Sequence, residues 1–406
     1  MENQQIKKLL TRNVEEVIIQ KDLEKKLNSG KKLRIKLGCD PSRPDLHLGH
    51  SVVLRKLKEF QDLGHQIVFI IGDYTGMIGD PSGKSKTRPA LSKEEVKKNA
   101  KSYFEQVGKI LDLKKTEIKY NSEWFSKMKM EDILKLASKF TIARILERDD
   151  FSKRLKSGID VAASEIMYPI MQAYDSVMIK ADVEIGGTDQ KFNMLAGRDL
   201  QRKMNLPEQN IITTTLLIGL DGKQKMSKSL DNYIGIAEKP NSMFGKIMSI
   251  SDEMILYYFK LLTDISEDEL KQIEINLKDS SINPRDVKAK LAKEIITMYH
   301  DKKSAERAEE EFNKIFRDKK KPTEIPEFKF SAKEGDIREC RLLDLLIETR
   351  LAFSKSDARR LIQQGGVKID DIVQKDFNKV IKVKDGMIAQ VGKRKFVKIT
   401  TDSTLS

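Results

Sequence analysis

The residue pair best suited to chemistry is His47 and His50, in the segment GCDPSRPDLHLGH at positions 38–50. This segment lies between a predicted strand and a predicted helix, and histidines three residues apart share one face as a helix begins. The start of a helix also exposes N–H donors and carries partial positive charge. Imidazole donors there suit negative charge that develops on a phosphate. Two other interpretations stay open: a metal site that includes Cys39, and a merely capping role for one of the two histidines.

A second candidate is the lysine-rich loop DGKQKMSKS at positions 221–229, which follows an Asp-Gly turn. It carries Lys223, Lys225 and Lys228, and Met226 is its one apolar anchor. Lysines on such a loop can close on a polyphosphate and stabilise charge as it moves to the leaving group. The alternative is an ordinary solvated loop.

A third segment, GDYTGMIGDPSGKS at positions 72–85, is rich in glycine. It is similar to a phosphate loop, but Ile78 stands where the spacing GxxxxGK[ST] requires glycine. We therefore expect a floor for a substrate, with Asp73 and Asp80 as hydrogen-bond acceptors. An ordinary turn is the alternative.

Two further segments predict a polar pocket. In SEIMYPIMQAYDSVMIK (164–180), helical spacing places Tyr168, Gln172 and Asp175 on one face between apolar neighbours. A buried carboxylate at Asp175 needs a partner, which a ligand hydroxyl can supply. In VEIGGTDQKFN (183–193), a glycine pair after a strand permits close approach of a ligand.

The elements that must position these residues alternate between strand and helix. Leu33, Ile35 and Leu37 alternate as in a strand, helical periodicity follows up to Gly64, and IVFIIG (67–72) is typical of a buried parallel strand. Ser92 and Glu95 then form a capping box for the next helix, with its buried face at Val96, Ala100, Phe104 and Val107. This order predicts an α/β fold with a doubly wound parallel sheet, which binds ligands beyond the carboxyl ends of its strands.

Beyond position 240 the pattern changes to helices, one of which Asn283 caps with Pro284 at its first position. Val287, Leu291, Ile295 and Tyr299 mark its buried stripe. The segment KKKPTEIPEF (319–328) is typical of a linker because Pro322 and Pro326 prevent a helix. The sequence thus predicts three domains, at 1–239, 240–326 and 327–406.

The amino-acid composition indicates a polyanionic partner. The 406 residues carry a net charge of +14, and the segment 341–400 alone holds 14 basic and 7 acidic side chains. Such a concentration favours a module that binds nucleic acid over a diffuse excess of lysine. No apolar run is long enough to span a membrane, the start MENQQIKKLL resembles no secretion signal, and two cysteines fit a reducing compartment. We expect a soluble cytoplasmic protein.

The motifs HLGH (47–50) and KMSKS (225–229) resemble the two signatures of class I aminoacyl-tRNA synthetases. The segments GDPSGK, YPIMQAYD and IGGTDQ, in this order, resemble the bacterial tyrosyl-tRNA synthetases, and residues 341–370 resemble their small alpha-L RNA-binding motif. The resemblance implies a Rossmann-like catalytic domain, a helical anticodon-binding domain and a small basic α+β RNA-binding domain. It further implies a homodimeric ligase that activates L-tyrosine with ATP, accompanied by Mg²⁺, and transfers it to tRNA(Tyr).

The resemblance also implies roles for single residues. His47 and His50 would stabilise the α-phosphate transition state, and Lys225 and Lys228 the leaving pyrophosphate. The ATP-binding set would comprise these two histidines and Gly38, Asp40, Gly187, Asp189, Met226 and Lys228. The tyrosine-binding set would be Thr75, Asp80, Tyr168, Gln172, Asp175 and Gln190, with Asp175 accepting from the phenol. RNA would bind Lys355, Arg359, Arg360 and Lys368, and no protein residue would ligate a metal.

One position departs from many tyrosyl enzymes, which place a tyrosine where this chain has Lys36. The second contact to the phenol therefore stays undetermined at this point. Two other functions were weighed against the synthetase: a phosphate-loop NTPase with an RNA-binding tail, and a synthetase relative that binds RNA without catalysis. The glycine missing at position 78 argues against the first, and retention of both histidines and both signature lysines argues against the second.

Overall fold

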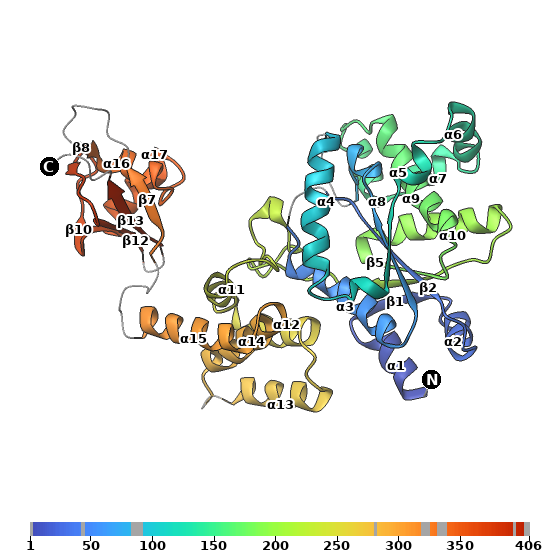
Figure 1. The fold of residues 1–406 in the computed structure, drawn as a ribbon, viewed down its shortest axis with the longest axis horizontal. Helices are drawn as coiled ribbons and strands as arrows, with labels where there is room; N and C mark the ends of the chain where they lie inside the picture. The colour runs from blue at the N-terminus through green and yellow to red at the C-terminus, as the bar shows by residue number, and fades with distance from the viewer. Residues whose placement is uncertain are drawn as a thin grey trace. The chain divides into compact units, whose positions relative to one another are not determined.

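The computed structural model describes residues 3–41, 45–82, 92–279, 282–317, 325–330, 339–392 and 395–401. The chain divides into two compact units, Met1–Ala305 and Glu306–Ser406 (Figure 1). The three-domain division at 239/240 and 326/327 stays a prediction.

The first unit is built on a six-stranded sheet with the strand order β1-β6-β5-β2-β3-β4. The strands are β1 (Val14–Ile18), β2 (Arg34–Cys39), β3 (Gln66–Ile71), β4 (Thr116–Tyr120), β5 (Val183–Gly187) and β6 (Asn210–Thr214). All pair in parallel except β1, which is antiparallel to β6. From β2 the chain builds outward through β3 to β4, then returns to β5 and β6 on the other side. The predicted doubly wound sheet is confirmed, and its strand order reverses between β2 and β5.

Helices cover both faces of this sheet. Helix α3 (Leu48–Asp62) packs against β3 and β5, and α10 (Lys191–Lys203) packs against β5 and β6. Figure 1 shows α3 and α4 (Lys93–Val107) on one side of the sheet, and α9 (Ala163–Met178) and α10 on the other. The smaller helices of this part are α1 (Asn3–Thr11), α2 (Gln20–Asn28), α5 (Ser122–Phe125), α6 (Met130–Ala137), α7 (Ile142–Leu146) and α8 (Asp149–Lys156).

The first predicted helix cap is confirmed, with one correction to the buried face. Ser92 caps α4 and forms the capping box with Glu95. Its buried face includes Tyr103, whereas Phe104, which the spacing placed in the core, is half-buried. Residues 103 and 104 are adjacent on the helix, so a small rotation of the face explains the difference.

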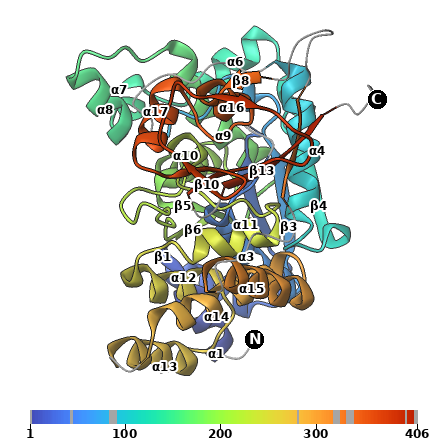
Figure 2. The same ribbon diagram turned by 90° about the vertical axis from the view of Figure 1, so that its left-hand side faces the viewer.

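Helices follow β6, as predicted: α11 (Pro240–Ile247), α12 (Ile255–Leu262), α13 (Glu267–Lys278), α14 (Pro284–Tyr299) and α15 (Lys302–Phe316). Asn283 caps α14 with Pro284 at its first position, and the predicted stripe of this helix is buried. Helices α12, α13 and α14 pack together and lie near α1 (Figure 2). Arg12 and Asn13, which follow α1, donate to the carbonyl oxygens of Thr263 and Leu261.

The second unit contains a five-stranded sheet, β10-β9-β12-β13-β7, and a two-stranded ribbon, β11-β8. Its elements are β7 (Glu327–Phe330), β8 (Glu339–Arg341), α16 (Leu342–Glu348), α17 (Lys355–Gln363), β9 (Val367–Ile369), β10 (Ile372–Gln374), β11 (Val380–Lys382), β12 (Ile388–Val391) and β13 (Lys395–Thr401). Leucines of α16 and apolar residues of α17, β9, β12 and β13 share one core. The predicted small α+β domain is confirmed.

The predicted linker at 319–328 is wrong at its end, where Glu327 and Phe328 begin the edge strand β7. Strand β7 pairs in parallel with β13, and Pro326 contributes its carbonyl oxygen to Lys398 N at 2.9 Å. An edge strand tolerates a proline beside its first residue because that position needs no N–H donor. Pro322 and the rest of the segment before 325 lie outside the described residues.

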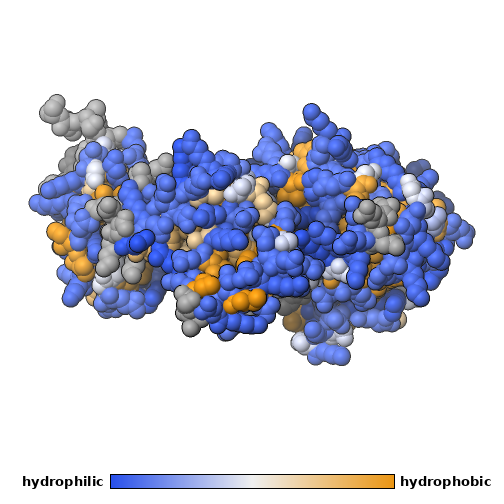
Figure 3. All heavy atoms as spheres, turned by 90° about the horizontal axis from the view of Figure 1, so that it is seen from below, coloured by the Kyte–Doolittle hydropathy of each residue, from blue (hydrophilic) through white to orange (hydrophobic). Residues whose placement is uncertain are grey.

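The face of the molecule in Figure 3 is mostly hydrophilic, with hydrophobic side chains in small groups. No helix within the described ranges combines the length and apolar character needed to cross a membrane.

Candidate active site

A cavity of about 290 Å³ lies where the strand order reverses, at the carboxyl ends of β2, β3 and β5. Helices α3 and α9 and the loop 225–227 form its other walls. Every residue predicted for catalysis, ATP or tyrosine lines it, with the exception of Lys228. Position in a doubly wound sheet alone makes this the expected ligand site.

Backbone pairing brings the histidine segment and the lysine loop together. Leu48 N donates to Ile234 O, and Ile236 N donates to Leu46 O, both at 2.9 Å. The loop before residue 234 is thereby held beside the start of α3. Met226 is buried in it, as expected of its apolar anchor. The sequence did not reveal Asn232, a buried side chain that accepts from Ser227 N at 2.7 Å and donates to Lys225 O.

The two imidazoles are held through their Nδ1 atoms. His47 is the N-cap of α3 and accepts from Gly49 N at 3.1 Å, while His50 accepts from His47 N at 3.2 Å. The ring centroids lie 3.9 Å apart. Only glycine fits at position 49, because a Cβ there would lie 2.9 Å from the His47 ring. Capping therefore involves both histidines, and it leaves both Nε2 atoms available to a ligand.

Both imidazoles are neutral at pH 7. Burial lowers the pKa of His50 to about 4, and nearby Lys228 acts in the same direction. Burial also lowers the pKa of His47 well below its usual range, and His50 and the two lysines add to this effect. With Nδ1 accepting from the backbone, the single proton of each ring lies on Nε2. The pair therefore offers two neutral N–H donors, and positive charge at the site comes from lysine and the start of α3.

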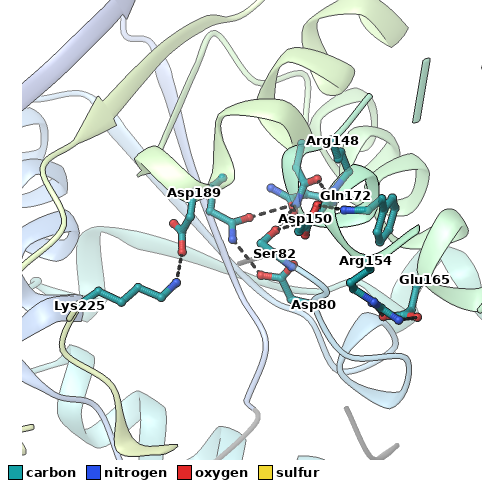
Figure 4. A network of polar contacts seen from close by, with 12 residues as sticks. Asp80, Ser82, Arg148, Asp150, Arg154, Glu165, Gln172, Asp189 and Lys225 are labelled. Carbon is teal, nitrogen blue, oxygen red and sulfur yellow. Dashed lines mark hydrogen bonds and ion pairs between the residues drawn. The ribbon is translucent and has the colours of Figure 1, made fainter. Parts of the chain in front are cut away.

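The predicted lysines take different places. Lys225 lines the cavity, and its Nζ lies 2.7 Å from Asp189 Oδ2 (Figure 4). Lys228 opens the short helix η4 (Lys228–Leu230) and donates to the carbonyl oxygen of Asp45, in the segment just before α3. Lys223 stays in the turn, where its N–H donates to Asp221.

Asp175 lines the cavity, with only 4% of its surface exposed. Its carboxylate accepts from Trp124 Nε1 at 3.0 Å and from Asn121 Nδ2 at 3.4 Å. Burial raises the pKa of this carboxyl to about 7, although Lys36 and the two hydrogen bonds lower it. The sequence prediction missed both donors. Trp124 is the single tryptophan of the chain, which was the one available signal.

Asp40 also lines the cavity and is bonded to two other residues of its wall. Its Oδ2 accepts from the Tyr168 hydroxyl at 2.8 Å, and its Oδ1 accepts from Thr75 Oγ1 at 2.7 Å. Gly72 makes this possible, since a Cβ there would lie 2.0 Å from Asp40 Oδ1. Asp40 was predicted beside adenosine, whereas its hydrogen bonds link it to two residues predicted for tyrosine.

The remaining polar residues form one network (Figure 4). Gln190 Nε2 donates to Asp80 at 2.8 Å, and Asn193 Nδ2 donates to the side-chain oxygens of Gln172 and Gln190 at 2.9 and 3.1 Å. Buried Arg148 donates to Asn193 Oδ1 at 2.7 Å and forms an ion pair with Asp150. Three residues predicted for tyrosine are thus connected through Asn193 and Arg148, which the sequence prediction missed.

One interpretation from the sequence needs correction. Asp73 accepts from the N–H and hydroxyl of Ser122 at the start of α5, so it is no part of the cavity floor. The side chain of Cys39 lines the cavity and is half-buried. Gly83, Lys84 and Ser85, which match the GK[ST] end of the phosphate-loop pattern, lie outside the described residues.

In the second unit, Lys355 and Arg359 lie one turn apart on α17, Arg360 follows, and Lys368 lies on β9. The first three are exposed and Lys368 is half-buried. The sequence prediction missed Phe353, which is 84% exposed and has Lys395 Nζ 4.6 Å from its ring centroid.

Two family models match the chain. Residues 27–317 match the class I tRNA synthetases (W and Y), and residues 305–399 match a tyrosine–tRNA ligase C-terminal domain. The tyrosine–tRNA ligase of Thermotoga maritima is 51% identical over 397 residues, which cover 98% of each chain. That of Carboxydothermus hydrogenoformans is 51% identical over 396 residues, 96% of each chain.

Solved structures agree in fold. A C-terminally truncated mitochondrial tyrosyl-tRNA synthetase from Aspergillus nidulans gives a TM-score of 0.63 at 22% identity, covering 77% of this chain and 94% of that one. The Archaeoglobus fulgidus tyrosyl-tRNA synthetase, solved with L-tyrosine, gives a TM-score of 0.61 at 24% identity, covering 76% of this chain and 99% of that one. With near-complete coverage by ligases of about half identical sequence, the chain belongs to the tyrosine–tRNA ligases of the class I aminoacyl-tRNA synthetase family.

Proposed function

We propose that the chain activates L-tyrosine with ATP in this cavity and transfers the tyrosyl group to the 3′-terminal ribose of tRNA(Tyr). One observation carries the proposal: a single cavity brings paired imidazoles and Lys225 together with the polar face of α9. The names of the bacterial relatives support it. So does the archaeal structural relative that was solved with L-tyrosine.

The phenol of tyrosine occupies the buried end, where Asp175 accepts a hydrogen bond from its hydroxyl group and Thr75 packs against the ring. A phenylalanine ring would leave the carboxylate without this partner, and tyrosyl-tRNA synthetases are the general example of rejection by this means. Trp124 and Asn121 hold the carboxylate in place for this contact.

The α-ammonium group of tyrosine lies at the opposite end of the substrate, among Asp80, Tyr168 and Gln172. Gln190 Nε2 donates to the Asp80 carboxylate at 2.8 Å and so fixes its orientation. Asn193 fixes the side-chain oxygens of both glutamines, which orients their amide groups. The surrounding carboxylate and amide oxygens stabilise the positive charge of the α-ammonium group.

ATP occupies the open end, near Gly38, Asp40, Gly187, Asp189 and Met226. No atom lies within 4 Å of the position that a Cβ would take at Gly38, so a ligand can approach the backbone there. The tyrosine carboxylate is already a nucleophile and needs no general base. It attacks the α-phosphorus, a bond forms between carboxylate oxygen and phosphorus, and pyrophosphate leaves with the electrons of the broken P–O bond.

Stabilisation of charge therefore carries the catalysis. The Nε2–H groups of His47 and His50 donate to the oxygens of the α-phosphate, where charge develops in the transition state. Lys225, and Lys228 from the rim, attract the leaving pyrophosphate. The ion pair with Asp189, which follows β5, holds the Lys225 ammonium group at the cavity, and the bond to Asp45 holds that of Lys228 just before α3.

Mg²⁺ enters as part of the substrate, MgATP. The described ranges contain no cluster of three or more His, Cys, Asp or Glu side chains that could hold a metal. Asp189 pairs with Lys225, and Asp80 accepts from Gln190 and Ser82. These carboxylates do not form a cage, so the ion would be held by phosphate oxygens and water, and would neutralise phosphate charge.

The second unit binds tRNA through Lys355, Arg359, Arg360 and Lys368. Lys355 and Arg359 share one helix face, which suits successive phosphates. Phe353 adds an exposed ring beside Lys395, a pairing typical of surfaces on which an unpaired base stacks.

In a salt titration of tRNA binding, Lys355→Ala and Arg359→Ala should each lower the salt dependence by about one ion. A Lys→Ala variant at exposed Lys382 is the matched control in the same unit.

We further propose that the protein is a cytoplasmic homodimer. Large apolar side chains stand exposed on α6, α7 and α8: Met130 at 70%, Leu134 at 62%, Ile142 at 64% and Leu155 at 47%. A second copy would bury them. Sedimentation should give twice the chain mass, and a Leu134→Glu/Ile142→Glu variant should sediment as a monomer.

Pyrophosphate exchange tests the proposed function directly. The purified chain should convert labelled pyrophosphate to ATP when L-tyrosine is added, because adenylate formation is reversible. Exchange driven by tryptophan alone would show that the Asp175 pocket is misassigned. ATP hydrolysis without any amino-acid dependence would instead support an NTPase.

A further inference from the structure

Beneath the cavity lies a buried ion pair that the proposed chemistry does not use. Lys36 on β2 and Glu184 on β5 are register partners in the sheet, with Nζ and Oε1 2.8 Å apart. The side chain of Lys36 is 0% exposed and that of Glu184 is 2% exposed. Removal of a lysine from water is unfavourable unless its charge is compensated and its N–H groups are bonded.

All three N–H groups of this lysine have acceptors within the protein. Besides Glu184, Lys36 Nζ donates to Ser176 Oγ at 2.7 Å and to the backbone oxygen of Gln172 at 3.0 Å. An ammonium group has three donors, so none remains for the phenol of a substrate. Lys36 thus makes no second contact to the phenol, and its effect on tyrosine must pass through other residues.

Both of these further acceptors belong to α9, and Asp175 lies between them on the helix. Ser176 Oγ also donates to Glu184 Oε2 at 3.0 Å, and Gln172 Nε2 lies 3.3 Å from Glu184 Oε1. The ion pair therefore joins one turn of α9 to the sheet, and this turn carries two of the residues proposed to bind tyrosine.

We propose that Lys36 is a positioning residue of the tyrosine pocket: it fixes the turn of α9 that carries Gln172 and Asp175, and places a buried positive charge behind the Asp175 carboxylate. The proposal rests on the proposed function and deepens it, since it names what determines specificity at the phenol. Lys36 does not contact the phenol itself. Its positive charge stabilises the ionised form of Asp175, the carboxylate that accepts from the phenol.

The electrostatics around Asp175 agree with this role. Lys36 lowers the pKa of Asp175 against the effect of burial, whereas Asp40 raises it. Tyr168 on the same helix, together with Asp40 and Asp80, which act on it electrostatically, are the other titratable groups near Asp175, and Glu184 pairs with Lys36. Loss of the Lys36 charge should leave more Asp175 protonated at pH 7, and a protonated carboxyl attracts the phenol less.

The test removes the ion pair without leaving a buried charge alone. In the double variant Lys36→Met/Glu184→Gln, we expect the KM for tyrosine in pyrophosphate exchange to rise about fivefold at pH 7, because a rise of one unit in the pKa of Asp175 lowers its ionised fraction from about one half to about one tenth. The KM for ATP should stay within twofold. The increase should diminish as the pH is raised toward 8.5, because the carboxyl ionises there even without Lys36.

A matched control exists in the same unit. Lys56 is also fully buried, and its Nζ lies 2.6 Å from Glu59 Oε2, but neither residue lines the cavity. Lys56→Met/Glu59→Gln should lower thermal stability and leave the KM for tyrosine unchanged. A penalty on tyrosine of the same size in both double variants, or one independent of pH, would overturn the proposal.

A milder variant serves if the double variant does not fold. Ser176→Ala removes one acceptor of Lys36 on α9 and keeps the ion pair, so the KM for tyrosine should rise a fewfold while the KM for ATP does not. An unchanged KM for tyrosine would refute the positioning role. Absence of tyrosine-dependent exchange in the unmodified chain would refute the proposed function instead, which keeps the two failures apart.

Discussion

At the scale of single residues, burial sets the protonation of the hydrogen-bond donors and acceptors in the site. His47 and His50 are neutral donors because burial disfavours their cations, and Asp175 titrates near neutrality because burial disfavours its anion. Each shift follows from the same cause acting on groups of opposite charge. The imidazoles are therefore unchanged across physiological pH, whereas the tyrosine pocket is not.

His50→Ala should lower kcat for tyrosine-dependent exchange by about 10²- to 10³-fold, the usual effect of removing one preorganised donor, with little change in the KM for tyrosine. His65→Ala is the control, because His65 also accepts a backbone N–H, from Leu33, but lies outside the cavity. Equal losses of kcat in both variants would show that His50 only supports the fold.

Asp175 makes tyrosine binding depend on pH. Its pKa in the fold, about 7, lies above the ordinary 3.8, so the carboxyl is protonated below pH 7 and ionised above it. Since the phenol donates to the ionised form, kcat/KM for tyrosine should rise from pH 6 to 8. Asp175→Asn should abolish this rise, increase the KM for tyrosine about 10- to 100-fold and weaken rejection of phenylalanine. Unchanged selectivity in a competition assay would contradict the assignment.

At the scale of elements, periodic segments were predictable and short ones were not. The alternation at 33–37 and the apolar run at 67–72 gave β2 and β3, and helical spacing gave α3, α4, α9 and α14. Helix α5 has four residues, too few to show a helical period. The sequence analysis therefore missed Trp124 in this helix and Asn121, its N-cap, as donors to Asp175. The pairing of 46–48 with 234–236 joins segments far apart in the chain, which local patterns do not record.

Trp124→Phe tests the contribution of this short helix. It removes the indole N–H that stabilises ionised Asp175, so the pKa of Asp175 should rise and the pH midpoint of kcat/KM for tyrosine should move upward. Phe125→Leu is the control, since Phe125 belongs to the same apolar cluster and is not among the hydrogen-bond donors to Asp175. An equal midpoint in the two variants would show that the indole has no electrostatic role.

At the scale of the whole molecule, the cavity and the basic segment belong to different compact units. The cavity lies within Met1–Ala305, whereas the basic segment lies within Glu306–Ser406. The second unit has its own core of seventeen buried residues. The sequence predicts three domains, with boundaries at 239/240 and 326/327, and that division stays a prediction beside these two compact units.

Deletion of the chain after Pro326 should leave formation of tyrosyl-adenylate intact and impair aminoacylation of tRNA, because phosphate contacts supply much of the affinity for RNA. Exchange and aminoacylation are measured on the same preparation. An equal loss of both activities would show that the second unit is needed for the fold of the first.

The central claim is that adenylate formation proceeds by stabilisation of charge with no proton-abstracting group. The most direct test is the single-turnover rate of tyrosyl-adenylate formation at saturating tyrosine and ATP between pH 6 and 8.5. We predict a rate that does not change over this range, since both imidazoles stay neutral. A rate that rises with a midpoint between pH 6 and 7, and loses this rise in His50→Ala, would reveal an imidazole base and contradict the account.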